Sequence, residues 1–208
     1  MADSRVTVLS DVNFEIRAGD LAALSGPSGS GKTTLLHLIA GLERPTSGWI
    51  EWPALGDRRD LMPSNVAIAF QGPSLLPPLD VIENVSLPVL LSGAGQSQAR
   101  ARAAEMLDIF ELGDLAGKLP EELSGGQMQR VAIARALAPA PRVIIADEPT
   151  GQQDHGTGAR LMTTLLEVAR ASGAALIVAT HDPSVANLLE RRLVLADGAL
   201  REEVKSPC

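Results

Sequence analysis

The most informative segment of this chain is a glycine-rich loop that reads Gly26-Pro27-Ser28-Gly29-Ser30-Gly31-Lys32-Thr33-Thr34. It fits the pattern G-x-x-x-x-G-K-[ST] of phosphate-binding loops. Residues 20–25 before it, with an apolar run from Leu21 to Leu24, predict a short buried strand. Residues 34–40 after it have the apolar spacing of a helix, which we expect to end at Gly41. A loop between a strand and a helix is the setting in which this pattern binds phosphate, so the segment predicts a phosphate site.

The residue types of the loop explain how it would bind. Glycines allow backbone N–H groups to turn toward a phosphate, and the helix N-terminus adds its dipole. Lys32 supplies a positive charge for β- and γ-phosphates, and the Thr33 hydroxyl can ligate Mg²⁺. We therefore expect a phosphate ligand bound together with Mg²⁺.

Composition limits the function classes. The chain has 208 residues and a net charge of −7, without a basic run, so it is a poor candidate for binding nucleic acid. Its single cysteine, Cys208, permits no disulfide within the chain, and we expect a reducing cytoplasm. We expect no signal peptide, and no apolar run approaches the length of a membrane span. A role at a membrane would therefore require a spanning partner.

The first third of the chain is rich in predicted strands. Residues 5–9 and 12–16 alternate apolar and polar side chains, which is typical of strands with one solvated face. Residues 49–52 predict another strand, and residues 66–70 predict a buried one that ends at Gln71.

The middle of the chain, residues 72–125, is mostly helical by its pattern. Asp80 and Glu83 predict a capping box, and Pro88 is expected to kink or end the helix that follows. Ser97 is expected to cap the next amphipathic helix. We interpret this region as a helical insert in a phosphate-loop α/β core.

A second set of small residues precedes a further predicted helix and reads Leu123-Ser124-Gly125-Gly126-Gln127. It repeats the arrangement of the phosphate loop, because the N-terminus of a helix presents free N–H donors. We therefore expect a second anion-binding helix N-terminus here.

Polar residues follow two buried strands of the last third. Asp147 and Glu148 follow residues 143–146, and His181 follows residues 174–180. Ligands of open α/β sheets bind at the carboxyl ends of the strands, so these residues predict metal and water chemistry. The alternative is that these residues are an ordinary solvated strand end. This alternative is weak, because a phosphate loop already requires a partner for Mg²⁺.

In this order, the motifs resemble those of the nucleotide-binding subunit of an ATP-binding cassette (ABC) transporter, over nearly the whole chain. The motifs are the phosphate loop, Gln71, the signature 123–127, the carboxylates 147–148 and His181. The resemblance implies an α/β fold, with a P-loop NTPase core, an N-terminal antiparallel β subdomain and a helical insert. Residues 1–208 would form a single ABC ATPase domain. Its core and β subdomain would comprise residues 1–71 and 139–208, and its helical subdomain residues 72–138.

The resemblance also implies a role for each motif residue. ATP would be bound by Gly26, Pro27, Ser28, Gly29, Ser30, Gly31, Lys32, Thr33 and Thr34. Mg²⁺ would be ligated by Thr33, Gln71 and Asp147. The catalytic residues would be Glu148, which orients the attacking water, together with His181 and Gln71. The signature residues would act in trans on the γ-phosphate bound by the other subunit, and they are Ser124, Gly125, Gly126 and Gln127. Asp154 would link the two sites of the dimer.

More narrowly, residues 75–85 and 151–154 are similar to subunits of the lipoprotein-release and macrolide-export type. The partners implied are a membrane-spanning permease and a second ATPase subunit, a homodimer in preference to a heterodimer, on the cytoplasmic face of the membrane. Two alternatives remain. One is a nucleotide switch that regulates a membrane complex without transport, as in cell division. The other is a nucleic-acid or ribosome-associated cassette, which the single signature and the acidic balance disfavour.

The chain departs from the family pattern at two places. The family usually stacks adenine on an aromatic residue near the N-terminus, and residues 1–5 contain none. This departure predicts weak discrimination between ATP and GTP. Gln153 stands where the family commonly has leucine, which bears on communication between the two sites and not on hydrolysis.

Overall fold

The computed structural model describes residues 7–72 and 74–203, and its centre is a six-stranded sheet in the order β2-β3-β4-β1-β5-β6. The strands are β1 Leu21–Ser25, β2 Val66–Ala69, β3 Val143–Asp147, β4 Ala175–Ala179, β5 Arg191–Ala196 and β6 Ala199–Glu203. All neighbouring pairs are parallel except β5 and β6, which form an antiparallel hairpin. Its turn has positive φ at Asp197 and Gly198, the conformation that Asp-Gly dipeptides favour in tight hairpin turns.

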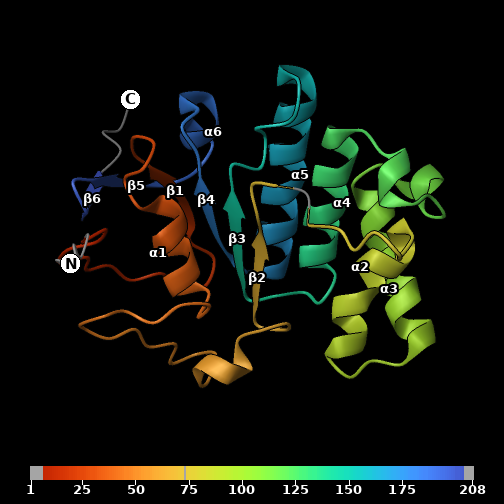
Figure 1. Ribbon diagram of the computed structural model, residues 1–208, viewed down its shortest axis with the longest axis horizontal. Helices are drawn as coiled ribbons and strands as arrows, with labels where there is room; N and C mark the ends of the chain where they lie inside the picture. The colour runs from red at the N-terminus through yellow and green to blue at the C-terminus, as the bar shows by residue number, and fades with distance from the viewer. Residues whose placement is uncertain (1–6, 73, 204–208) are drawn as a thin grey trace, which may run out of the picture.

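The helices are α1 Lys32–Ile39, α2 Val81–Leu91, α3 Gln96–Ile109, α4 Gly125–Leu137, α5 His155–Ser172 and α6 Pro183–Asn187. Three short 3₁₀ helices cover Arg58–Asp60, Gly113–Leu115 and Pro120–Glu122. Figure 1 shows α2 and α3 at the opposite end of the molecule from the β5–β6 hairpin. No helix within residues 7–72 and 74–203 has the length and apolarity needed to cross a membrane.

The sheet separates two apolar clusters, because successive strand residues point to opposite faces. In β1, Leu21 and Ala23 belong to a cluster with residues of α2 to α6, while Ala22 and Leu24 belong to a cluster with α1. Every residue of β4 is buried, as expected of a central parallel strand with helices on both faces. This double covering confirms the α/β fold class.

The capping box predicted at Asp80 is present in the structure, which also shows a second box at Ser124. The Asp80 carboxylate accepts a hydrogen bond from the Glu83 N–H at 2.8 Å, and Glu83 accepts one from the Asp80 N–H at 3.0 Å. Ser124 and Gln127 form the same reciprocal pair at the start of α4. Each box satisfies N–H groups that the first turn of a helix leaves without a partner.

The prediction of strands at residues 5–9, 12–16 and 49–52 was wrong, because none of these segments forms a strand among the described residues. The alternation was nevertheless meaningful. Val12, Phe14 and Ile16 are half-buried and pack on the α1 side of the sheet, so burial, without ladder hydrogen bonds, accounts for the pattern. Among the described residues, the two strands that pair in antiparallel fashion are β5 and β6. Residues 1–5 and Cys208 lie outside the described residues.

In the helical insert, the predicted cap at Ser97 was wrong, and so was the end of the helix that was one of the two outcomes expected at Pro88. Helix α3 begins at Gln96 with Gly95 as its N-cap, so Ser97 lies inside the first turn and is not the cap. The Ala99 N–H already donates to the Gly95 carbonyl, so the backbone starts the helix without a side-chain cap. Pro88 does not end α2, because the helix continues to Leu91 with buried Val89 packed in the core.

Candidate functional site

The predicted phosphate loop joins the end of β1 to the start of α1. Gly26 has φ 152°, and a side chain there would place its Cβ 2.2 Å from the Leu195 carbonyl oxygen, so only glycine fits. The Lys32 ammonium donates to the Gly26 and Pro27 carbonyls at 2.8 and 3.1 Å. The positive charge of Lys32 therefore lies directly against the loop, as anion binding requires.

Thr33 and Asp147 are brought together across the sheet. The Thr33 hydroxyl donates to the Asp147 carboxylate at 2.8 Å, and Asp147 is only 5% exposed. The strands that lead to these residues, β1 and β3, are separated by β4. A hydroxyl and a carboxylate are ligand types that Mg²⁺ prefers, together with phosphate oxygens and water. The described ranges contain no group of three or more His, Cys, Asp or Glu residues that could hold a metal ion.

Glu148 and His181 form the second pair at this edge of the sheet. His181 Nδ1 lies 2.8 Å from Glu148 Oε1, and the two side chains are 77% and 10% exposed, respectively. The Glu148 N–H donates to the Ala179 carbonyl at 2.9 Å, so the β3–β4 pairing continues up to the carboxylate. A mostly buried carboxylate held by an imidazole at the water-facing edge is suited to orienting and polarising a water molecule.

The backbone of Glu148 is also unusual. Its φ is 49°, in the left-handed region that non-glycine residues rarely adopt. Such conformations cost about 1–3 kcal/mol and persist only where the surrounding structure imposes them. The conformation turns the chain immediately after the buried Asp147, and it therefore lets two adjacent carboxylates serve two different partners.

Gln71 follows β2, whose neighbour in the sheet is β3, so it lies at the same edge. Its side chain is exposed and has no hydrogen bond to any described residue, so the structure does not bring it to Thr33 or Asp147. The chain around it is attached to α4. Gln129 donates to the Phe70 carbonyl at 3.4 Å, and Arg135 donates to the Ser74 carbonyl at 2.8 Å.

The signature residues form the start of α4, as predicted. The Ser124 hydroxyl accepts from the Gln127 N–H at 3.2 Å, which makes Ser124 the N-cap. Gln153 donates its side-chain amide to the Gly126 carbonyl at 2.7 Å, so the turn before Asp154 lies against the signature. Sequence reasoning noticed Gln153 as a departure but could not predict this partner, since the two residues are far apart along the chain.

Asp154 is the N-cap of α5. Its carboxylate accepts from the Thr157 N–H at 3.0 Å, and the hydrogen bonds from Thr157 hold the pKa of Asp154 below its ordinary value. Within one subunit, Asp154 therefore acts as a helix cap, and its predicted link between two sites stays a prediction.

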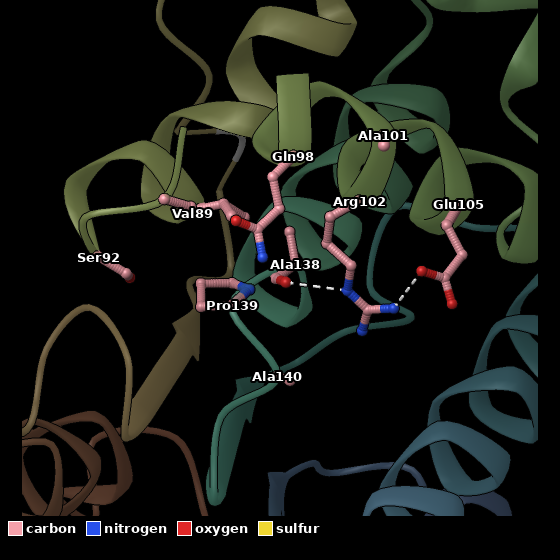
Figure 2. A pocket seen from close by; sticks show the side chains of 10 residues that line it. Val89, Ser92, Gln98, Ala101, Arg102, Glu105, Ala138, Pro139 and Ala140 are labelled. Atoms are coloured by element: carbon pink, nitrogen blue, oxygen red, sulfur yellow. Dashed lines mark hydrogen bonds and ion pairs between the residues drawn. The ribbon is translucent and has the colours of Figure 1, made fainter. Parts of the chain in front are cut away.

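A separate hollow of about 440 Å³ lies away from these motifs, between α2, α3 and the end of α4. Figure 2 shows Arg102 on its wall, donating to the Ala138 carbonyl at 3.1 Å and paired with Glu105 at 2.6 Å. No residue of the phosphate loop or of the two pairs lines this hollow, so it is not the nucleotide site.

A mostly parallel sheet that gathers a phosphate loop, a Thr–Asp pair and a Glu–His pair at one edge is typical of a phosphate-loop nucleoside triphosphatase. A family model described as "ABC transporter" matches residues 9–151. The chain belongs to the ABC transporter family, and it is an ATP-binding and ATP-hydrolysing subunit.

Relatives and solved structures agree with this assignment. The chain is 44% identical over 202 residues to the lipoprotein-releasing system ATP-binding protein LolD of Paramagnetospirillum magneticum, covering 94% of this chain and 89% of the relative. It is 41% identical to LolD of Legionella pneumophila (strain Paris), covering 95% and 90%. It is similar to the dimeric structure of the bacterial ABC transporter cassette MJ0796, with a TM-score of 0.91, 38% identity and coverage of 100% and 95%.

Proposed function

We propose that two copies of this chain close around ATP and so drive a membrane-spanning partner of the lipoprotein-release type. The observation that carries the proposal is that the Thr33–Asp147 and Glu148–His181 pairs both lie at the edge of the sheet where the phosphate loop lies. The names of the LolD relatives support the lipoprotein-release type and favour a transporter subunit over a regulatory switch. The dimeric MJ0796 structures, one bound to ADP and Pi, support the pairing of two copies.

In this proposal the chain positions ATP, and little covalent chemistry is required of it. Residues 26–34 bind the phosphates, with Lys32 as the point charge. Thr33, Asp147 and Gln71 would hold Mg²⁺, which would neutralise charge on the phosphate oxygens when bound. Glu148 orients and polarises the water, and His181 holds the Glu148 carboxylate and contacts the γ-phosphate.

The second subunit completes each site. The N-terminus of α4 presents free N–H groups and a positive dipole, and it would close on the γ-phosphate bound by the partner. Its residues Ser124, Gly125, Gly126 and Gln127 would act in trans, and Asp154 would link the two sites. ATP binding then shifts the population from open to closed dimers.

The membrane partner would dock on the link that follows Gln71, on the proposed helical subdomain of residues 72–138. Leu76 in this link is 41% exposed, and the link is held to α4 through Arg135 and Ser74. A force on this link is therefore transmitted to the helix that carries the signature. The chain would lie on the cytoplasmic face of the membrane through this partner. Co-purification of the chain with a membrane-spanning protein tests this part.

The dimer proposal predicts that hydrolysis depends on protein concentration. Since each site needs residues from two subunits, the ATPase rate should rise more steeply than linearly with protein concentration while most of the protein is monomeric. Steady-state phosphate release across a hundredfold dilution series measures this. A rate strictly proportional to protein concentration, with only monomers present by light scattering, would contradict it.

The absence of an aromatic residue in residues 1–5 predicts weak base discrimination. Val8, 41% exposed, lies beside Gly31 of the phosphate loop and offers an apolar surface that does not distinguish adenine from guanine. An aromatic stack contributes on the order of 1 kcal/mol, so we expect the Kd values for ATP and GTP to agree within about tenfold. Competition of both nucleotides against a fluorescent analogue measures the ratio. A preference for ATP of a hundredfold would show that the base is recognised.

A further inference from the structure

We infer that Gln153 is a positioning residue that ties the signature turn of α4 to the loop after Glu148, so that the two ATP sites of a dimer respond to each other. The inference rests on the proposed closure of two copies around ATP. It concerns how one subunit transmits the state of its own site to the signature turn that serves its partner's site.

The first observation is the hydrogen bond itself. Gln153 Nε2 donates to the Gly126 carbonyl at 2.7 Å, between residues 27 positions apart, and the contact is partly buried. Gly126 is the second residue of α4. The bond therefore acts on the first turn of the helix, the turn whose N–H groups would face the partner's phosphate.

The second observation is the fit of the turn against the two glycines. A Cβ at Gly126 would lie 2.8 Å from Gln153 Oε1, and a Cβ at Gly125 would lie 3.0 Å from Gln152 Oε1. The glutamine amides fill the space that the two glycines leave. Gln153 is half-buried and Gln152 is exposed, and of the two only Gln153 has a hydrogen bond to the signature in the described part of the chain.

The other end of the connection is Glu148. The Gly151 N–H donates to the Glu148 carbonyl at 3.1 Å, and the Gln153 N–H donates to the Thr150 carbonyl at 3.0 Å. Two successive turns thus join the catalytic carboxylate to Gln153. Asp154 follows directly and caps α5, which holds the end of this segment in place.

These contacts form one continuous path from Glu148 to the first turn of α4. A shift of the Glu148 loop on ATP binding or hydrolysis moves the Gln153 amide and with it the Gly126 carbonyl. Without the amide, the signature turn must be ordered when the dimer closes, so closure becomes less favourable although each subunit still binds ATP. Coupling of this kind is a free energy between two sites and is measured as such.

The test is Gln153→Leu in a Glu148→Gln background, where ATP is bound but not hydrolysed. We expect the ATP Kd of the monomer, measured at protein concentrations well below the dimer Kd, to be unchanged. We expect the Kd of the ATP-bound dimer to rise about five- to twentyfold, since each subunit loses one neutral hydrogen bond. Sedimentation equilibrium measures the second quantity and fluorescent-nucleotide titration the first.

Gln152→Leu in the same background is the matched control, because it makes the same substitution in the same turn without removing a hydrogen bond to α4. We expect its dimer Kd to be unchanged. Gln153→Met, which keeps the chain length and lacks the amide, serves as a second variant and replaces Gln153→Leu if that protein fails to fold. If Gln153 only stabilised the fold of its own subunit, its substitution would lower the melting temperature and leave the dimer Kd unchanged.

An unchanged dimer Kd for Gln153→Leu and Gln153→Met, or an equal rise for Gln152→Leu, would overturn the inference. Both results leave the proposed function intact, since the Glu148→Gln protein still dimerises. Failure of the Glu148→Gln protein itself to dimerise with ATP would overturn the proposed dimer, and this inference with it.

Discussion

Glu148→Gln is expected to lower ATP turnover about a thousandfold, or ~4 kcal/mol in transition-state free energy, while ATP still binds. The glutamine amide keeps the shape of a side chain that is 10% exposed and lies against His181. It removes the negative charge that polarises the attacking water. The nucleotide should therefore remain bound, and an ATP-dependent dimer should accumulate. Single-turnover hydrolysis and light scattering with ATP measure the two effects.

Glu111→Gln is the matched control for this variant. Glu111 also has a positive φ, 56°, and is exposed in the helical region, outside the two pairs. Its turnover should match the unsubstituted protein. If Glu148→Gln hydrolysed ATP at the normal rate as a monomer, the role proposed for Glu148 would be wrong.

Lys32→Ala is expected to raise the ATP Kd about thirtyfold, or ~2 kcal/mol, the scale of a hydrogen bond to a charged group. The Lys32 ammonium lies against the Gly26 and Pro27 carbonyls at the loop, so its loss removes a positive charge held at the proposed phosphate site. Titration with a fluorescent ATP analogue at low salt measures the change.

Lys118→Ala tests whether the effect is specific to the loop. Lys118 is exposed, and its side chain has no ion pair within the described residues, so its removal changes the net charge equally without touching the site. ATP affinity should be unchanged in that variant. Equal affinity of Lys32→Ala and the unsubstituted protein would refute the assignment of the loop.

Local signals were predictable because neighbouring residues produce them. The loop between β1 and α1, the capping box at Asp80 and the helix start after residues 123–127 each depend on residues within a few positions. Sequence reasoning failed where two local readings compete. The alternating apolar residues at 12–16 fit a strand, and they fit equally well an extended segment that packs on the core without pairing to a neighbouring strand. The structure shows the extended segment.

The sequence by itself predicted a phosphate-binding loop before a helix and was enough to place the chain among ABC ATPases, because glycines, lysine and capping residues act over short distances. Only the tertiary structure decided which polar residues meet. The order β3-β4-β1 brings Asp147 to Thr33 across an intervening strand, and the register Asp147–Ala179 brings Glu148 to His181. The contact of Gln153 with Gly126 depends likewise on how α4 packs beside the turn after β3. Such contacts join residues far apart in the chain, and the pairing and packing of whole elements position them.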